Sequence, residues 1–91
     1  MDFDWDDRKA AGNLKKHRVS FSEAATIFGD PLSRTYSDPD HSFDERRFIT
    51  IGTSERGRLL IVSHTERGDG IHIISAREVA RAERSLYEAE D

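Results

Sequence analysis

The stretch RRFITIGTSERGRLLIVSHTERGDGIHIISAR, residues 46–77, decides the fold of this chain. It predicts three strands, at residues 46–53, 58–65 and 71–76, because these segments are rich in the Ile, Val, Leu and Phe residues that favour sheets. The two connections between them, residues 54–57 and 67–70, are short and contain glycine, which is typical of hairpin turns. The sequence therefore predicts an antiparallel meander.

Pairing Thr53 with Arg58, and Glu66 with Ile71, assigns the side chains of the meander to two faces. One predicted face is the core face, and it carries Ile49, Ile51, Leu60, Val62, Ile71 and Ile73, with Arg47, His64, Ser75 and Arg77 towards its ends. The other predicted face is mixed, and it carries Arg46, Phe48, Thr50, Ile61, Ser63, Thr65, His72 and Ile74. We expect the mixed face to be half solvated or to hold a site.

The composition limits the classes of protein to which the chain can belong. Its 91 residues predict one domain, residues 1–91, and the absence of cysteine excludes disulfides, cysteine nucleophiles and thiolate metal sites. We find no export leader and no apolar run of membrane-spanning length, so we expect a cytoplasmic protein without a membrane partner. The formal net charge of -4 disfavours general coating of nucleic acid, so any such binding must come from a local cluster among the 14 Lys and Arg residues.

Further elements are expected on both sides of the meander. Residues 1–5 alternate apolar and acidic side chains and predict an edge strand, and residues 32–36 predict a second short strand. Residues 7–17 and 20–28 predict two N-terminal helices, and residues 76–90 predict a charged C-terminal helix. The expected fold class is therefore α+β, with an antiparallel sheet meander and helices gathered against one face.

Motifs at both ends of the chain resemble one known family. The N-terminal block comprises Phe3-Asp-Trp-Asp6, Lys9, Asn13, Lys16-His17, Val19-Ser-Phe21 and Glu23-Ala-Ala25, and the ending comprises Ile73-Ile-Ser-Ala-Arg77, Glu83 and Tyr87. Between them follow, in family order, Asp30-Pro31, Glu45-Arg46, Gly52, Arg58, Val62, His64 and Arg67. In these residues the chain is similar to the BrnT-type toxins of bacterial type II toxin–antitoxin pairs.

The resemblance implies a RelE-like α+β fold and a ribonuclease activity that stops translation. It also implies neutralisation by a BrnA-type antitoxin, which carries a ribbon-helix-helix region for binding operator DNA. The complex in such systems represses its own promoter, and we expect a heterotetramer built on the antitoxin dimer.

Two positions depart from the family pattern. Arg18 stands where glycine commonly follows Lys-His, and it would be strained if the helix ends there in a left-handed conformation. His72 stands where an arginine is common before Ile-Ile-Ser-Ala-Arg, so a titratable group replaces a fixed charge.

Metal-independent RNA cleavage requires a base, an acid and cations for the phosphate. The family motif favours His64, Arg67 and Arg77 as catalytic residues, with no cofactor and no metal. His64 and His72 are possible acids or bases, and Glu45 and Glu66 are alternative bases. Candidates for binding RNA are Arg46, Arg47, Arg58, His72 and Tyr87. His41 with Asp38 and Asp40 is a weaker pattern for a metal site.

Structural interpretations compete with these functional ones. A histidine inside an apolar strand, as predicted for His64, is often a core residue, and Arg77 could bind a carboxylate or a helix end instead of a phosphate. Trp5 is expected in the core and could also seat a segment of an antitoxin. The alternative function is a non-catalytic protein-binding module that acts within a transcriptional regulatory complex.

Overall fold

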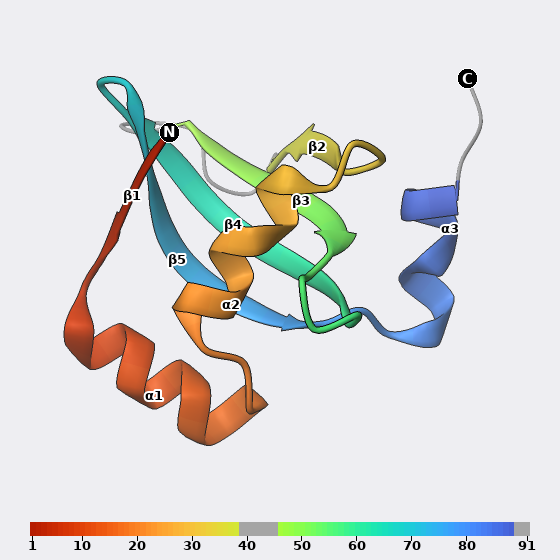
Figure 1. Ribbon diagram of the computed structural model, residues 1–91, viewed down its shortest axis with the longest axis horizontal. Helices are drawn as coiled ribbons and strands as arrows, with labels where there is room; N and C mark the ends of the chain where they lie inside the picture. The colour runs from red at the N-terminus through yellow and green to blue at the C-terminus, as the bar shows by residue number, and fades with distance from the viewer. Residues whose placement is uncertain (39–45, 89–91) are drawn as a thin grey trace.

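A mixed five-stranded sheet forms the centre of the computed structural model, which describes residues 1–38 and 46–88 (Figure 1). The strands are β1 (Asp2–Trp5), β2 (Arg34–Ser37), β3 (Arg47–Thr53), β4 (Leu59–Arg67) and β5 (Gly70–Glu78), in the spatial order β1-β5-β4-β3-β2. The predicted meander of β3, β4 and β5 is antiparallel, and β2 also pairs antiparallel. The sheet as a whole is not antiparallel, because β1 pairs parallel with β5. No hairpin joins these two strands, so no local turn sets their relative direction.

Two helices and a 3-10 turn, α1 (Asp7–His17), α2 (Phe21–Thr26) and η1 (Ile27–Gly29), cover one face of the sheet (Figure 1). The predicted second helix therefore ends as an α-helix at Thr26 and continues as η1. The predicted C-terminal helix begins later than expected, because β5 extends to Glu78 before η2 (Arg81–Glu83) and α3 (Arg84–Glu88). No helix in the described part of the chain is long and apolar enough to cross a membrane.

The hydrophobic core lies between the helices and the sheet. Its fully buried members are Val19, Phe21, Ala24, Ile27, Leu60, Val62, Ile73 and Ala76, and the rings of Phe3, Trp5 and Phe28 pack against them. Gly52 allows η1 to approach β3 closely, because a Cβ at this position would lie 3.1 Å from atoms of Ile27 and Ser33. The core therefore depends on a close contact between η1 and the sheet.

The pairing of β3 with β4 differs from the predicted register by one residue. Thr53 lies opposite Leu59, not Arg58. The cause is the turn, in which Ser54 pairs with Arg58 and Gly57, at φ +82°, supplies the left-handed residue of a three-residue loop. Because side chains alternate, the slip moves Ile49 and Ile51 to the face opposite Leu60 and Val62.

The pairing of β4 with β5 begins as predicted, with Glu66 opposite Ile71, and then shifts at a β-bulge. His64 lies opposite Ile73 and Ser63 lies opposite Ser75, so Ile74 is the extra residue of the bulge. Beyond the bulge the faces exchange, and Ala76 enters the core while Ser75 and Arg77 leave it. The placement of Ser75 and Arg77 on the core face is therefore wrong.

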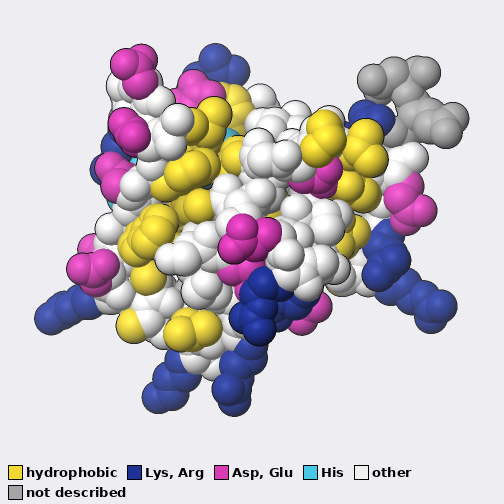
Figure 2. Space-filling model, in the orientation of Figure 1, with side chains coloured by type: hydrophobic (Ala, Val, Ile, Leu, Met, Phe, Trp, Pro, Cys, Tyr) yellow, Lys and Arg dark blue, Asp and Glu magenta, His cyan; other side chains and the backbone are white. Residues whose placement is uncertain are grey.

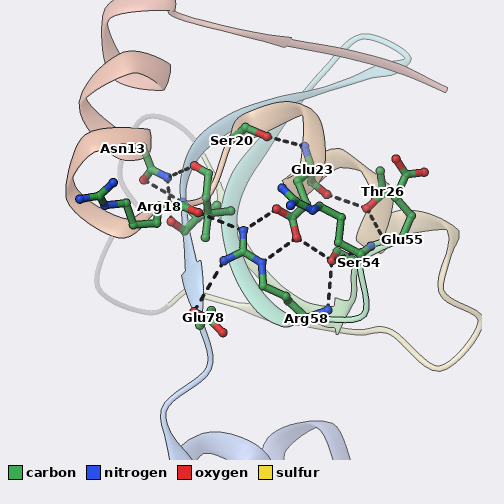
Figure 3. Close-up of polar contacts among 12 residues, drawn as sticks. Asn13, Arg18, Ser20, Glu23, Thr26, Ser54, Glu55, Arg58 and Glu78 are labelled. Atoms are coloured by element: carbon green, nitrogen blue, oxygen red, sulfur yellow. Dashed lines mark hydrogen bonds and ion pairs between the residues drawn. The ribbon is translucent and has the colours of Figure 1, made fainter.

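Asn13 joins α1 to the strand beyond the bulge. Its Nδ2 donates to the carbonyl oxygens of Val19 at 3.0 Å and Ala76 at 2.8 Å, and its Oδ1 accepts from the amide of Ala76 at 3.1 Å (Figure 3). These buried bonds satisfy backbone groups of two separate segments. They fix the end of α1 against β5.

Arg18 ends α1 in a left-handed conformation, at φ 61° and ψ 29°, with its amide donating to Leu14. It is the only residue other than glycine with a positive φ among residues 1–38 and 46–88. The strain expected from the family comparison at this position is therefore present.

Replacing Arg18 with glycine should stabilise the protein by about 1 kcal/mol, because glycine occupies this conformation without the steric cost of a Cβ. The Arg18 side chain is exposed, so its loss removes little packing. Arg18→Ala is the matched control, since it also removes the side chain but keeps the Cβ. Urea denaturation should show the gain for Arg18→Gly alone, and equal midpoints for the two variants would contradict this account.

Candidate active site

The face of the sheet opposite α1 and α2, called here the distal face, gathers many of the polar side chains singled out in the sequence. Side chains in register across paired strands share a face. By register, the distal face carries Asp4, Arg34, Tyr36, Arg47, Ile49, Ile51, Ile61, Ser63, Thr65, Arg67, His72, Ser75 and Arg77. Arginines stand at both ends of this face, and hydroxyl groups lie between them.

Arg77 forms a bidentate ion pair at one end of the distal face. Its Nη1 and Nη2 donate to the two carboxylate oxygens of Glu83 at 2.7 and 2.8 Å. Hydrogen bonds from Arg77, together with one from the amide of Ala80, lower the pKa of Glu83 to about 2. The Arg77 side chain is still 42% exposed. An anion from solvent can therefore reach the guanidinium, but it must share it with Glu83 or replace Glu83.

His64 lies on the helix-facing side of β4, where it is 3% exposed. The Phe28 ring meets it edge-on and the Phe48 ring stacks beside it, with ring centroids 5.0 and 5.8 Å away. Its Nε2 lies 2.7 Å from Thr50 Oγ1, and its Nδ1 has no hydrogen-bond partner among the described residues. Burial lowers the pKa of His64 to about 4, so the ring is neutral at pH 7.

Three other arginines proposed from the sequence lie near one end of the sheet. Arg67 is exposed at the end of β4, and Arg47 is partly buried on the distal face. The guanidinium of Arg46 lies 5.5 Å from the centre of the Phe48 ring. These side chains border one end of the sheet, whereas Arg77 lies at the other end.

Arg58 is held in a network on the helix side of the sheet (Figure 3). Its Nε donates to Glu23 at 2.9 Å, and its Nη2 donates to the Arg18 carbonyl at 3.0 Å. The hydrogen bond from Arg58 is the largest cause that lowers the pKa of Glu23, and Ser54 adds another bond at 2.7 Å. Arg58 therefore ties the end of α1 and α2 to the β3–β4 turn.

Tyr87 lies on α3, close to the end of η1. Its hydroxyl donates to Asp30 Oδ2 at 2.7 Å and lies 3.4 Å from Thr53 Oγ1. Nearby, the Tyr36 hydroxyl donates to the Leu86 carbonyl at 2.6 Å. These two tyrosines hold α3 beside the β2–β3 edge of the sheet.

His72 forms a pair with Asp4 on the distal face. The two residues are register partners on β5 and β1, and His72 Nδ1 lies 2.5 Å from Asp4 Oδ1. The His72 side chain is 15% exposed and that of Asp4 is 70% exposed. The pair places an oriented imidazole at the end of the face that also carries Arg47 and Arg67.

The residues predicted as catalytic do not form one cluster in this structure. Arg67 and Arg77 share the distal face, but they stand at opposite ends of it, since Arg67 lies six positions along β4 from Ile61, the partner of Arg77. At about 3.3 Å per residue, this separation is roughly 20 Å. His64 points into the other layer.

Sequence reasoning missed Asp4 as the partner of His72 and did not consider Tyr36 or Arg34 for the site. The alternation of Phe3, Asp4 and Trp5 does indicate that Asp4 faces away from the core. It does not indicate which strand lies beside β1, and this pairing is what brings Asp4 to His72.

No group of three or more His, Asp or Glu side chains in residues 1–38 and 46–88 is arranged to hold a metal ion. His41, the histidine of the weaker metal pattern in the sequence, and the alternative base Glu45 lie outside the described residues. The other alternative base, Glu66, is exposed on β4.

Fold and site together define a small α+β domain with helices on one sheet face and, on the second face, arginines and hydroxyl groups around buried isoleucines. The chain belongs to the family of BrnT ribonuclease toxins of type II toxin–antitoxin systems, whose model matches residues 5–83. The family resemblance seen in the sequence is thereby confirmed.

A solved structure supports the fold. The chain is similar to the crystal structure of the Brucella abortus ribonuclease toxin, BrnT, with a TM-score of 0.68 and 19% sequence identity. The alignment covers 89% of this chain and 99% of that chain. No curated protein gives a significant match.

The buried His64 should make stability depend on pH between about 4 and 6.5. The unfolded chain binds a proton at this histidine as the pH falls through that window, whereas the folded chain does not, so acid favours unfolding. The loss between pH 7 and pH 5 should be about 2 kcal/mol.

His64→Gln removes this titration and retains a side chain that can bind Thr50. Urea unfolding of both proteins at pH 7 and pH 5 measures the difference, and the wild type should lose about 2 kcal/mol more than the variant. Above about pH 7.5, His64 is neutral in both the folded and the unfolded chain. The stability curves of the wild type and His64→Gln should therefore run parallel there, which serves as a control. Parallel curves over the whole range would contradict the buried neutral state of His64.

Proposed function

We propose that this protein is an endoribonuclease toxin, and that it cleaves RNA on the distal face and so inhibits translation. The observation that carries the proposal is the match to the BrnT ribonuclease toxin family over residues 5–83. The arrangement of the distal face supports it, since Arg77 stands at one end and Arg47 and Arg67 at the other. Arginines so placed suit the phosphates of an extended RNA strand.

The proposed reaction needs no metal ion. A base takes the proton of the ribose 2′-hydroxyl, the 2′ oxygen forms a bond to phosphorus, and the bond from phosphorus to the 5′ oxygen breaks. The 5′ oxygen leaves with a proton, so the products are a 2′,3′-cyclic phosphate and a 5′-hydroxyl end. Arginine side chains stabilise the charge that builds on the phosphate oxygens.

The predicted catalytic residues have different places in this proposal. Arg67 and Arg77 bind different phosphates, several nucleotides apart along one strand, because the two arginines stand at opposite ends of the sheet. His64, which is 3% exposed beneath η1, supports the sheet from behind and does not contact RNA in this arrangement. Arg58 and Tyr87 secure the turn and α3 that border the site, and Arg46 remains a candidate for binding RNA at the Arg47 end.

The proposal includes an antitoxin partner, because the family consists of toxins of toxin–antitoxin systems. We propose a BrnA-type antitoxin with a ribbon-helix-helix region, a heterotetrameric complex that binds operator DNA and represses its own promoter, and a cytoplasmic location. A RelE-like relationship of the fold belongs to the same proposal. The family resemblance in the sequence supports each of these points.

A second candidate function, a non-catalytic protein-binding module, is favoured by a groove on the helix side. Figure 2 shows apolar side chains on this side of the molecule, and basic side chains that project from its lower edge. The groove is lined by Trp5, Ala10, Ala11, Leu14, Ser20, Phe21 and Ser22. Leu14 is 49% exposed, and Lys15 and Lys16 follow it in the last turn of α1. Such a surface suits an apolar segment with acidic neighbours.

Cleavage of purified RNA decides between the two functions. The protein should fragment total RNA without ribosomes and in the presence of EDTA, and adding the protein encoded beside it should abolish the fragments. Cleavage that requires magnesium would contradict the metal-independent mechanism. Intact RNA, with and without ribosomes, would favour the binding module.

Removing the carboxylate that pairs with Arg77 should strengthen RNA binding. In Glu83→Gln the guanidinium no longer has an anionic partner. The RNA dissociation constant should therefore fall severalfold, which corresponds to a gain of about 1 kcal/mol in binding free energy. Arg77→Gln should raise the dissociation constant about tenfold. The slope of log K against log salt concentration should fall by about one, because one phosphate contact is lost.

Glu88→Gln is the matched control, because it makes the same charge change at an exposed position of α3. Fluorescence anisotropy with a labelled, uncleavable RNA measures binding over a range of salt concentrations. Equal tightening by Glu83→Gln and Glu88→Gln would assign the effect to net charge and not to Arg77.

A further inference from the structure

The His72–Asp4 pair has the geometry of an oriented proton acceptor. His72 Nδ1 lies 2.5 Å from Asp4 Oδ1, which is a hydrogen-bonding distance. When the imidazole donates its Nδ1 proton to this carboxylate, Nε2 carries the lone pair and can accept a proton. A base held by a third group in this way is a recurring feature of sites that activate a hydroxyl.

Packing on the opposite side of the sheet fixes the pair. Phe3 and Trp5 flank Asp4 in β1, Ile71 and Ile73 flank His72 in β5, and all four pack on the core. Alternation then requires both Asp4 and His72 to face the distal side, in register with each other. The orientation of His72 therefore follows from burial of its neighbours as well as from the hydrogen bond.

The surroundings of His72 suit a phosphate beside it. In the same row of the sheet lie Thr65 on β4 and Arg47 on β3, so Arg47 is two strands away, about 10 Å between backbones. Among the described residues, Arg67 and Asp2 are the charged ones in the next row of this face. An arginine side chain can bridge most of this distance, so one phosphate can contact Arg47 while the neighbouring ribose lies at His72.

The other histidine of the predicted site offers no such geometry. His64 is 3% exposed in the opposite layer, with Nε2 engaged by Thr50 and Phe28 packed against the ring. A ribose hydroxyl cannot reach it without displacement of η1. Of these two histidines, His72 is the one on the face that carries the arginines.

We propose that His72, oriented by Asp4, is the base that takes the 2′-hydroxyl proton during RNA cleavage. This inference rests on the ribonuclease function proposed above. His72 Nε2 accepts the proton as the 2′ oxygen bonds to phosphorus, and the 5′ oxygen leaves with a proton from solvent. Asp4 is a positioning residue, which holds the ring and stabilises the imidazolium that forms.

The test uses an RNA oligonucleotide that contains a cleavage site mapped in total RNA. His72→Ala should lower kcat by about 10²–10⁴-fold with little change in KM, and added imidazole should restore part of the activity. Asp4→Ala should lower kcat less, while Asp4→Glu should recover some of the loss. Asp2→Asn, a charge change on the same strand two residues away, should retain the wild-type kcat.

Further measurements separate catalysis from structure. Thermal melts should show that the variants remain folded, and His72→Gln serves as a second variant if His72→Ala does not fold. An oligonucleotide with a 2′-deoxyribose at the mapped site should remain intact, and cleavage there would overturn the proposed step.

The remaining outcomes distinguish the inference from the function on which it rests. Wild-type kcat in either His72 variant, or a loss that imidazole does not restore, would overturn the role of His72 and leave the ribonuclease function in place. Wild-type kcat in Asp4→Ala would remove Asp4 from the mechanism. A wild-type protein that cleaves no RNA, with or without ribosomes, would overturn both proposals.

Discussion

The register of β4 against its two neighbours is the constraint on which the rest of the structure depends. Leu60 and Val62 must enter the core, and the strand alternates, so Ile61 between them and Ser63 after them must face the distal side. The β3–β4 turn then decides the side on which the isoleucines of β3 lie, and the bulge in β5 decides the side on which Arg77 lies. A change of one residue at either place would exchange the faces.

Two polar clusters fasten the helical layer to this sheet. Asn13 binds both backbone groups of Ala76, directly beyond the bulge, and Arg58 joins Glu23 of α2 to the β3–β4 turn. Both clusters are anchored at places where the register is set. Because their side chains are largely buried or bidentate, a shift in register would leave polar groups without partners. The two clusters therefore favour one register of the strands, which apolar packing between the helices and the sheet would not specify by itself.

Much of the fold could be predicted from the sequence, because the meander, the first helix and the edge strand each have a clear local pattern. The failures occurred where one residue decides the geometry. Gly57 indicates a turn, but it does not indicate that the loop has three residues. Ile74 is an additional residue in a strand that otherwise alternates, and no local pattern distinguishes it. The parallel pairing of β1 is a contact between the two ends of the chain, which no local pattern encodes.

The candidate site was harder to predict than the fold for the same reason. Arg77, Arg67 and His64 all belong to the family pattern, but a site requires a common face. The register separates His64 from the arginines, and the distance along β5 separates the arginines from each other. The substitution at His72 looked like the loss of a cation. Its partner is Asp4, 68 residues earlier, so this partner can be identified only from the sheet order.

The two ends of the distal face differ in what RNA binding requires of them. Arg77 uses both terminal nitrogens to bind Glu83, so a phosphate that occupies this guanidinium must compete with a carboxylate whose pKa is lowered to about 2. His72 uses only Nδ1 to bind Asp4, and Nε2 is the nitrogen on which the proposed chemistry depends. In these proposed roles, the Arg77–Glu83 pair must admit or give way to a phosphate, whereas the His72–Asp4 pair must stay closed. In the proposed function, the adjustable ion pair therefore lies at the Arg77 end and the fixed geometry at the His72 end. Because the net charge of -4 does not attract a polyanion, this function depends on such local groups.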